Sequence, residues 1–357
     1  MSWLILSFVL WQGADFEVLE KRSVEAREIL KKDSVYFRRA NKSAKSRIVS
    51  RDILLAVGSP SVDEINTIRL AVEVPISTRG SSFKFKTVTP GYIVERISGA
   101  GITRLIFKVT DKITNEEFTV WDSRHLHLEN QRTSPRDLFY FPYSDVFQQE
   151  YFTEKGFLFY KNITRESQNE LCASGAKSKA YPEKLLCEVF PDHWLLTLGA
   201  IEQMDDGEFF KNSDYSVNKF LTHIARNSSE AFFYSVSVDG ARGLTQFMNS
   251  KRFPTYNQTR IDCPEIKLIS DFEKGMADMK NSIKSAICLA DMNLSKFPDS
   301  AKKKFLEDPF RGGEAVAAAH NGGLGRALNY LRGKKIPKET QNFIKKYKET
   351  WKIFESR

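Results

Sequence analysis

The chain has 357 residues, of which 41% are hydrophobic and 28% are charged. This length and composition suit a globular protein of two domains and exclude a low-complexity or largely disordered chain. The net charge of +9 favours an anionic partner, but the sequence has no zinc-finger spacing, no P-loop and no RNP-type aromatic run, so we expect no nucleic acid.

Residues 1–14 form an apolar run followed by small residues. The run is too short to cross a bilayer but has the length of a signal-peptide core, although no Lys or Arg precedes it. We interpret it as an atypical export signal with Ala14 as the candidate cleavage edge, which predicts a periplasmic or secreted protein of the cell envelope. The alternative is the amphipathic or buried start of a cytoplasmic protein.

The next segment, residues 15–49, is predicted as a short surface helix followed by a basic linker. Residues 15–32 combine alternating charge with apolar residues at helical spacing, and residues 33–49 are strongly basic. Such a basic run is typical of a solvated linker, and contact with an acidic polymer is the alternative.

Over residues 50–135 apolar residues recur at every second position, which predicts a β-rich domain. Short strands are expected at residues 69–75, 83–88, 92–97, 103–109 and 117–121. His125 and His127 would point to one side of a strand, but without a third ligand they are more typical of surface residues than of a metal site, so we expect neither metal nor cofactor. The sequence does not identify the role of this domain; an envelope protein is its candidate partner.

Composition changes over residues 131–147, and helical patterns dominate afterwards, with Ser144 as the expected cap of a helix beginning at Asp145. The sequence therefore predicts an α+β protein, in which the β-rich domain is followed by a mainly helical domain over residues 140–357. Nothing in the sequence indicates the oligomeric state.

Four cysteines, all in the helical domain, are candidates for disulfide bonds: Cys172, Cys187, Cys263 and Cys288. None forms a CxxC motif, so a zinc cluster is not expected. Cys172 and Cys187 flank a segment of small residues and lysines that a disulfide could close, and the even count fits an oxidising compartment. Four unpaired buried thiols are the alternative, because sequence does not determine connectivity.

Residues 191–203 predict a helix with Pro191 in its first turn. Leu195, Leu198 and Glu202 share one stripe of this helix, which is apolar until it ends in the carboxyl group. Burial at this position should raise the pKa of Glu202, as a general acid near neutral pH requires.

Residues 235–248 form a polar loop, punctuated by Gly240 and Gly243, that runs into an apolar turn containing Gln246. Glycines at this spacing suit a sharply turning backbone that a ligand can approach closely. A second glycine loop, residues 317–326 (Ala-Ala-Ala-His-Asn-Gly-Gly-Leu-Gly-Arg), closes an alanine-rich helix.

Together the two loops resemble the lysozyme-like soluble lytic transglycosylases, whose motifs read Ser-x-x-Gly-Ala-x-Gly-Leu-x-Gln-x-Met and Ala-Ala-Tyr-Asn-x-Gly-x-Gly-Arg. The resemblance covers about residues 190–350, and the N-terminal half carries none. In this family the catalytic glutamate ends a helix ahead of the first loop, a placement that Glu202 matches.

The sequence departs from the family at two points. Gln203 follows Glu202 where the family usually has Ser, and 35 residues instead of about ten separate Glu202 from Ser237. An insertion over about residues 204–231, with its own helix pattern, is therefore expected. It makes Glu230, seven residues before Ser237, the alternative catalytic residue, although the preceding Asn-Ser-Ser resembles a helix end and cap that would leave Glu230 solvated.

The resemblance also implies a set of substrate-binding residues: Ser237, Gly240, Ala241, Gln246, Met248, His320, Asn321 and Phe343. Asn321 is expected across from the glutamate, unless it only terminates its helix. His320 replaces a usual tyrosine, and Phe343 stands where a tyrosine often contacts the glutamate. The lysines of the last helix, residues 334–348, are expected on a solvated face that favours an anionic wall.

The implied function is cleavage of peptidoglycan glycan strands at the bond between N-acetylmuramic acid and N-acetylglucosamine, with one glutamate as acid and then base and a 1,6-anhydro product. If Asp205 or Asp206 positions a water, the protein would instead be a hydrolytic lysozyme. A non-catalytic wall-binding or secretion-scaffold protein is the third interpretation, which the replaced tyrosines favour.

Overall fold

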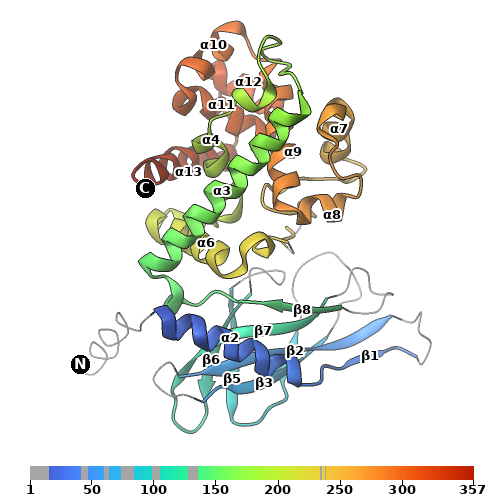
Figure 1. Cartoon of the computed structure of the whole chain (residues 1–357), viewed down its shortest axis with the longest axis vertical. Helices are drawn as coiled ribbons and strands as arrows, with labels where there is room; N and C mark the ends of the chain where they lie inside the picture. The colour runs from blue at the N-terminus through green and yellow to red at the C-terminus, as the bar shows by residue number, and fades with distance from the viewer. Residues whose placement is uncertain are drawn as a thin grey trace. The chain divides into compact units, whose positions relative to one another are not determined.

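A computed structural model describes residues 16–41, 47–59, 64–73, 84–98, 105–127, 136–233, 235–237 and 239–357, so the candidate export signal at 1–14 lies outside the described residues. The chain divides into two compact units, residues 1–152 and 153–357 (Figure 1). The first contains an antiparallel β-sheet and the second is helical, so the fold is α+β. In the described part of the chain, no helix combines the length and apolarity needed to cross a membrane.

The first unit is a sheet in the order β4-β3-β2-β7-β6-β5, in which β1 also pairs with β2 and β8 with β7. The strands are β1 Phe37–Arg39, β2 Ile48–Gly58, β3 Asn66–Glu73, β4 Phe85–Thr87, β5 Tyr92–Ser98, β6 Ile106–Asp111, β7 Glu117–His127 and β8 Arg136–Tyr140. On β3, alternate residues Ile68, Leu70 and Val72 are buried, which is the period of two expected for a strand with one face on a core.

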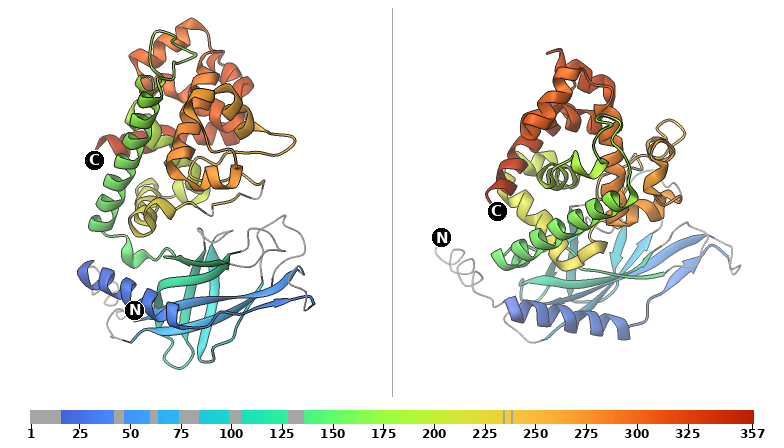
Figure 2. Two further views of the ribbon diagram at one scale, coloured as in Figure 1. Left: turned by 45° about the vertical axis from the view of Figure 1, so that its right-hand side comes forward. Right: turned by 45° about the horizontal axis from the view of Figure 1, so that its top comes forward.

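The segment predicted as a separate helix and linker belongs to the sheet unit. The helix α2 (Phe16–Lys32) packs on β2 and β7, as the two views of Figure 2 show, and Arg27 Nε lies 2.7 Å from the fully buried carboxylate of Asp122 on β7. The predicted basic linker contains β1 and the start of β2. The linker prediction was wrong because strand pairing uses backbone groups, and basic side chains are well tolerated on an edge strand.

His125, expected on the surface, is instead buried in β7, where its Nε2 lies 2.8 Å from Oγ of Ser123. The pattern of the strand did not reveal this because β7 pairs with β2 on one side and β8 on the other. The structure does not describe the side chain of His127.

The helical unit is built around α4 (Asp192–Gln203) and α11 (Pro309–Gly322). Residues 194–201 of α4 and 312–319 of α11 are all buried, and small side chains on α11 let neighbouring helices approach closely. The other helices are α3 Glu150–Ser174, α5 Asp206–Phe209, α6 Ser213–Asn227, α7 Thr255–Asp262, α8 Phe272–Ala277, α9 Met279–Leu294, α10 Asp299–Glu307, α12 Leu324–Leu331 and α13 Lys338–Glu355.

Two local features bear on the sequence predictions. Ser144 precedes a short 3₁₀ turn, Asp145–Phe147, but its side chain makes no capping hydrogen bond. The expected insertion, residues 204–231, contains α5, α6 and the 3₁₀ turn Ser228–Glu230.

The cysteines form two disulfide bonds. Cys172 at the end of α3 is bonded to Cys187 in the turn before α4, and Cys263 at the end of α7 is bonded to Cys288 on α9. No cysteine is free. Each bond therefore joins the end of one helix to a later segment of the helical unit.

Candidate functional site

Glu202 lies in the last turn of α4, where the buried stripe of Leu195 and Leu198 ends. Its side chain is 15% exposed, so the carboxyl group is largely removed from water yet reaches the surface. Three segments of the chain lie at this helix end: the α13 helix, the glycine loop of residues 235–248 and the end of α11.

Lys346 of α13 closes the end of α4. Its ammonium group donates hydrogen bonds to the carbonyl oxygens of Ile201 (3.0 Å) and Met204 (2.9 Å) and forms an ion pair with Asp206 at 2.8 Å. A cation at this position satisfies carbonyl groups that the helix leaves without partners. The prediction that Lys346 belongs to a solvated face was wrong: its side chain is 6% exposed.

The same ammonium group determines the charge of Asp206. Burial alone would push the pKa of this carboxyl up, but the hydrogen bond and the positive charge of Lys346, with a further bond from Asn342, lower it below its usual value. Asp205 is also engaged, since its side chain accepts a hydrogen bond from the backbone N–H of Glu208 (3.0 Å) and caps α5. Both aspartates beside Glu202 therefore hold local structure.

Gln203 connects α4 to the glycine loop. Its Nε2 donates to the carbonyl oxygens of Gly243 (2.9 Å) and Leu244 (2.7 Å), and its Oε1 accepts from Ser235 Oγ (3.0 Å). Gln203 stands where the family motif usually has Ser, and no sequence pattern predicts a role for it. In the structure it fixes the loop directly beside the residue that carries the carboxyl group.

The loop is also held from within. Ser237 Oγ accepts from the backbone N–H of Ala241 (2.9 Å), and Gln246 Nε2 donates to Ser235 Oγ (3.1 Å) and to the Gly243 carbonyl (2.7 Å). Ser237 and Gln246, which the resemblance places on the substrate, thus make internal bonds that shape the loop.

Backbone conformation explains the glycines. Gly240 and Gly243 have φ of 88° and 73°, a region that side chains with a Cβ rarely adopt. At Gly243 a Cβ would also overlap the carbonyl oxygen of Met276, whereas a Cβ at Gly240 would meet no other part of the described residues within 4 Å. The loop therefore needs Gly243 for space as well as for conformation.

His320 lies in the last turn of α11, and its ring contacts both the glycine loop and Glu202. Its Nε2 lies 3.0 Å from the carbonyl oxygen of Thr245 and 3.4 Å from Oε1 of Glu202, and its side chain is 5% exposed. A carbonyl oxygen only accepts, so Nε2 carries the proton and Nδ1 does not. Nδ1 is buried and has no hydrogen-bond partner among the described residues.

Burial lowers the pKa of His320 to about 4, against a smaller opposing effect of the hydrogen bond to Thr245. The ring is therefore neutral at pH 7. Its single N–H is donated to the carbonyl oxygen of Thr245, and the ring contacts the carboxyl group of Glu202 without a positive charge.

The remaining predicted residues have distinct surroundings. Asn321, expected across from the glutamate, accepts a hydrogen bond from Thr340 Oγ1 of α13 (3.0 Å), and it is His320 that contacts Glu202. Adjacent residues of a helix point in different directions, so only one of the two can face α4. Glu230 is exposed in its 3₁₀ turn, and Phe343 is buried on α13.

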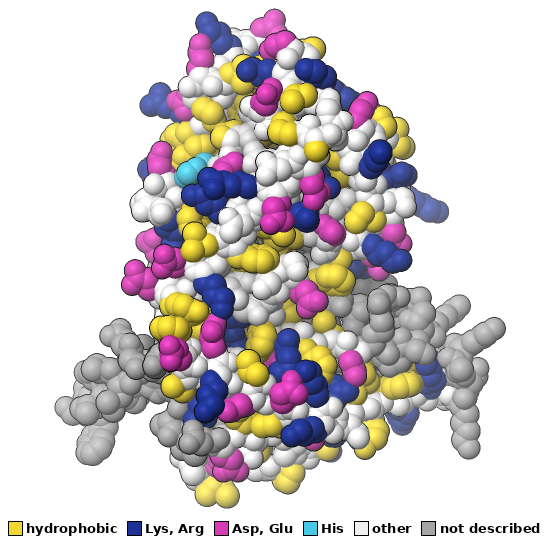
Figure 3. All heavy atoms as spheres, viewed as in Figure 1, with side chains coloured by type: hydrophobic (Ala, Val, Ile, Leu, Met, Phe, Trp, Pro, Cys, Tyr) yellow, Lys and Arg dark blue, Asp and Glu magenta, His cyan; other side chains and the backbone are white. Residues whose placement is uncertain are grey.

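Ala241 is buried within the loop, and the carbonyl oxygen of Met248 accepts the N–H of Tyr256 (3.0 Å). Among the described residues, no three His, Cys, Asp or Glu side chains gather as a metal site would require. On the face shown in Figure 3, basic and acidic side chains are interspersed, without an extended area of one sign.

Comparison with protein-family models, with curated proteins and with solved structures finds no match to this chain. The core of the candidate site is one partly buried carboxyl group at a helix end, which contacts a neutral imidazole and lies next to a polar loop with internal hydrogen bonds.

Proposed function

We propose that this chain is a peptidoglycan lytic transglycosylase, that its helical unit has a lysozyme-like fold, and that Glu202 is the catalytic acid and base. The observation that carries the proposal is the convergence on Glu202 of both glycine motifs: Gln203 binds the first loop, and His320 of the second motif contacts both that loop and the carboxyl group. Segments that resemble one family in sequence thus meet around one carboxyl group.

The chemistry requires a single proton carrier. Glu202 in its neutral form donates its proton to the glycosidic oxygen as the bond from that oxygen to C1 of N-acetylmuramic acid breaks. The resulting carboxylate takes the proton of the C6 hydroxyl, whose oxygen bonds to C1 and closes the 1,6-anhydro ring. The positive charge that develops at C1 is stabilised by the substrate's own N-acetyl group, so no second carboxylate is needed, in contrast to common glycosidases.

The surroundings of Glu202 support this outcome over hydrolysis. A hydrolytic lysozyme would need a second group to activate water, and the acidic residues that follow Glu202 in the sequence, Asp205 and Asp206, are bound to the backbone and to Lys346. Export to the cell envelope is part of the proposal, and it is supported by the two disulfides, which form and persist in oxidising compartments.

The test is mass spectrometry of the muropeptides that the full chain releases from purified peptidoglycan. We expect anhydro products from the wild type and from Glu230→Gln, and a loss of about a hundredfold or more in Glu202→Gln. Glu230→Gln is the matched control because Glu230 is exposed. Loss in that variant alone would move the acid to Glu230, products with reducing ends would indicate a hydrolase, and no release by the wild type would indicate a non-catalytic wall protein.

A further inference from the structure

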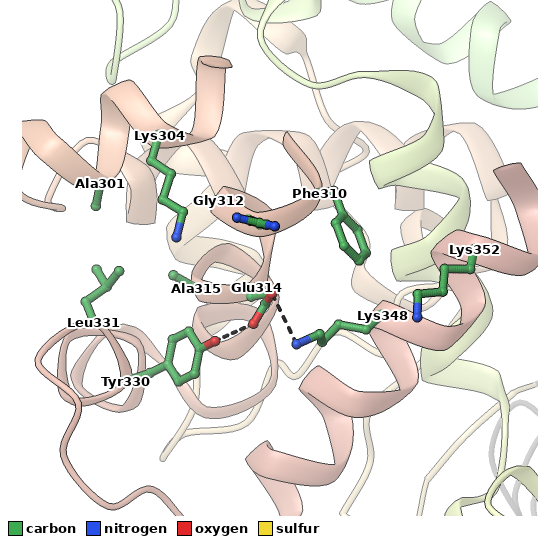
Figure 4. A pocket seen from close by; sticks show the side chains of 11 residues that line it. Ala301, Lys304, Phe310, Gly312, Glu314, Ala315, Tyr330, Leu331, Lys348 and Lys352 are labelled. Carbon is green, nitrogen blue, oxygen red and sulfur yellow. Dashed lines mark hydrogen bonds and ion pairs between the residues drawn. The ribbon is translucent and has the colours of Figure 1, made fainter. Parts of the chain in front are cut away.

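A cavity lies in the helical unit, between α10, α11, α12 and α13. Its volume is about 400 Å³, within the usual range for small-molecule sites. Neither Glu202 nor His320 lines it, so it is separate from the candidate catalytic site. Figure 4 shows its side chains around the carboxylate of Glu314.

The cavity has a strong excess of positive charge. Four basic residues line it, from three helices: Lys304, Arg311, Lys348 and Lys352. Glu314 is the one acidic residue among those that line it, and its side chain is 10% exposed.

The carboxylate of Glu314 is already satisfied by protein groups. Tyr330 donates its hydroxyl to Oε2, and Lys348 Nζ lies 3.5 Å from Oε1 (Figure 4). Burial, together with the bond to Glu314, raises the pKa of Tyr330, which therefore keeps its proton and remains a donor. Glu314 thus pairs with one lysine of the cavity, Lys348, and with none of the other three basic residues that line it.

Lys304 and Lys352 have no acidic partner in the part of the chain that the structure describes. Arg311 has only Asp308, at 3.6 Å and with the arginine side chain 70% exposed, an arrangement that contributes little. Apolar side chains, among them Phe310 and Leu331, line the rest of the cavity. The site therefore offers several cations next to an apolar wall.

We propose that this cavity binds a small ligand that carries a phosphate group beside an apolar ring or chain. Phosphate is close to a dianion at neutral pH and presents three acceptor oxygens, which suits several separate ammonium donors better than one carboxylate does. The apolar part of the ligand contacts Phe310 and Leu331. This proposal does not depend on the catalytic role of Glu202.

Phenyl phosphate is the probe, and its binding to the full chain is measured by calorimetry at physiological salt. The wild type should bind it saturably, and Lys304→Ala/Lys352→Ala should bind it about tenfold more weakly. Both lysines are exposed, so their removal leaves the core intact. The matched control is Lys303→Ala/Lys345→Ala, which removes the same charge from exposed positions of α10 and α13 outside the cavity and should change affinity less than about twofold.

A third variant is expected to strengthen the binding of phenyl phosphate instead of weakening it. Glu314→Gln removes the carboxylate that repels the ligand and should tighten binding of phenyl phosphate about threefold, while benzoate should bind the wild type at least about fivefold more weakly than phenyl phosphate. The proposal is overturned by an absence of saturable binding, by equal losses in the two double variants, by weaker binding in a folded Glu314→Gln, or by benzoate binding as tightly as phenyl phosphate. If Glu314→Gln fails to fold, the comparison of the two lysine double variants still tests the proposal.

Discussion

The ring of His320 lies beside the carboxyl group of Glu202, with 3.4 Å between Nε2 and Oε1. These residues end two different helices, and both lie next to the glycine loop. The contact joins the last turn of α4 to the last turn of α11, and the ring carries no positive charge at pH 7.

Burial of His320 predicts a pH dependence of stability. The ordinary pKa of the ring is 6.5 and its folded value is about 4, so between these values the unfolded chain binds more protons. The stabilisation is fully present above pH 6.5 and is lost as pH falls toward 4. In His320→Gln, the drop in unfolding free energy between pH 7 and pH 4.5, measured by urea denaturation, should be smaller by about 2 kcal/mol. An unchanged drop would contradict the assigned burial.

The conformation of the glycine loop predicts unequal effects of two similar substitutions. Gly243→Ala places a Cβ against the carbonyl oxygen of Met276 and strains a positive φ, so it should cost about 3 kcal/mol and displace the loop from Gln203. Gly240→Ala strains φ alone, with open space around it, and should cost about 1 kcal/mol. Chemical denaturation of both variants is the measurement. Equal costs would mean that the contact with Met276 is not formed.

Because Lys346 of α13 caps the end of α4, substitutions of Lys346 and of its neighbour Lys345 should differ in their effect on stability. Lys346→Met leaves the carbonyl groups of Ile201 and Met204 without their donor and should destabilise the chain by about 2 kcal/mol. The ion pair adds little to this figure, since the Asp206 side chain is 43% exposed. Lys345→Met is the control at an exposed position, with an expected change within about 0.5 kcal/mol. Matching thermal denaturation curves for the two variants would refute the assignment.

Much of the fold could be predicted because periodicity is a property of the sequence itself. The five expected strands correspond to β3 through β7, and β3 shows the alternating burial of a strand with one face on a core. The central strand β2 was missed because seven consecutive residues, 52–58, are buried, and a strand buried on both faces loses its alternation.

The site was partly predictable for the same reason. The spacing of Leu195, Leu198 and Glu202 indicates where α4 ends, but Gln203 and Lys346 bind backbone carbonyl groups, which every residue carries and no sequence pattern marks. Which of His320 and Asn321 faces Glu202 depends on the rotation of α11, and that rotation is determined by packing rather than by the motif.

The disulfides also bear on how the chain reaches its oxidised state. Four cysteines allow three pairings, and the structure uses the one that joins each cysteine to its nearest neighbour along the chain, with separations of 15 and 25 residues. Short loops are closed at the lowest entropic cost, so the unfolded chain already favours these contacts over the two crossed or nested arrangements. Oxidative folding should therefore reach the native connectivity with little reshuffling of mispaired bonds.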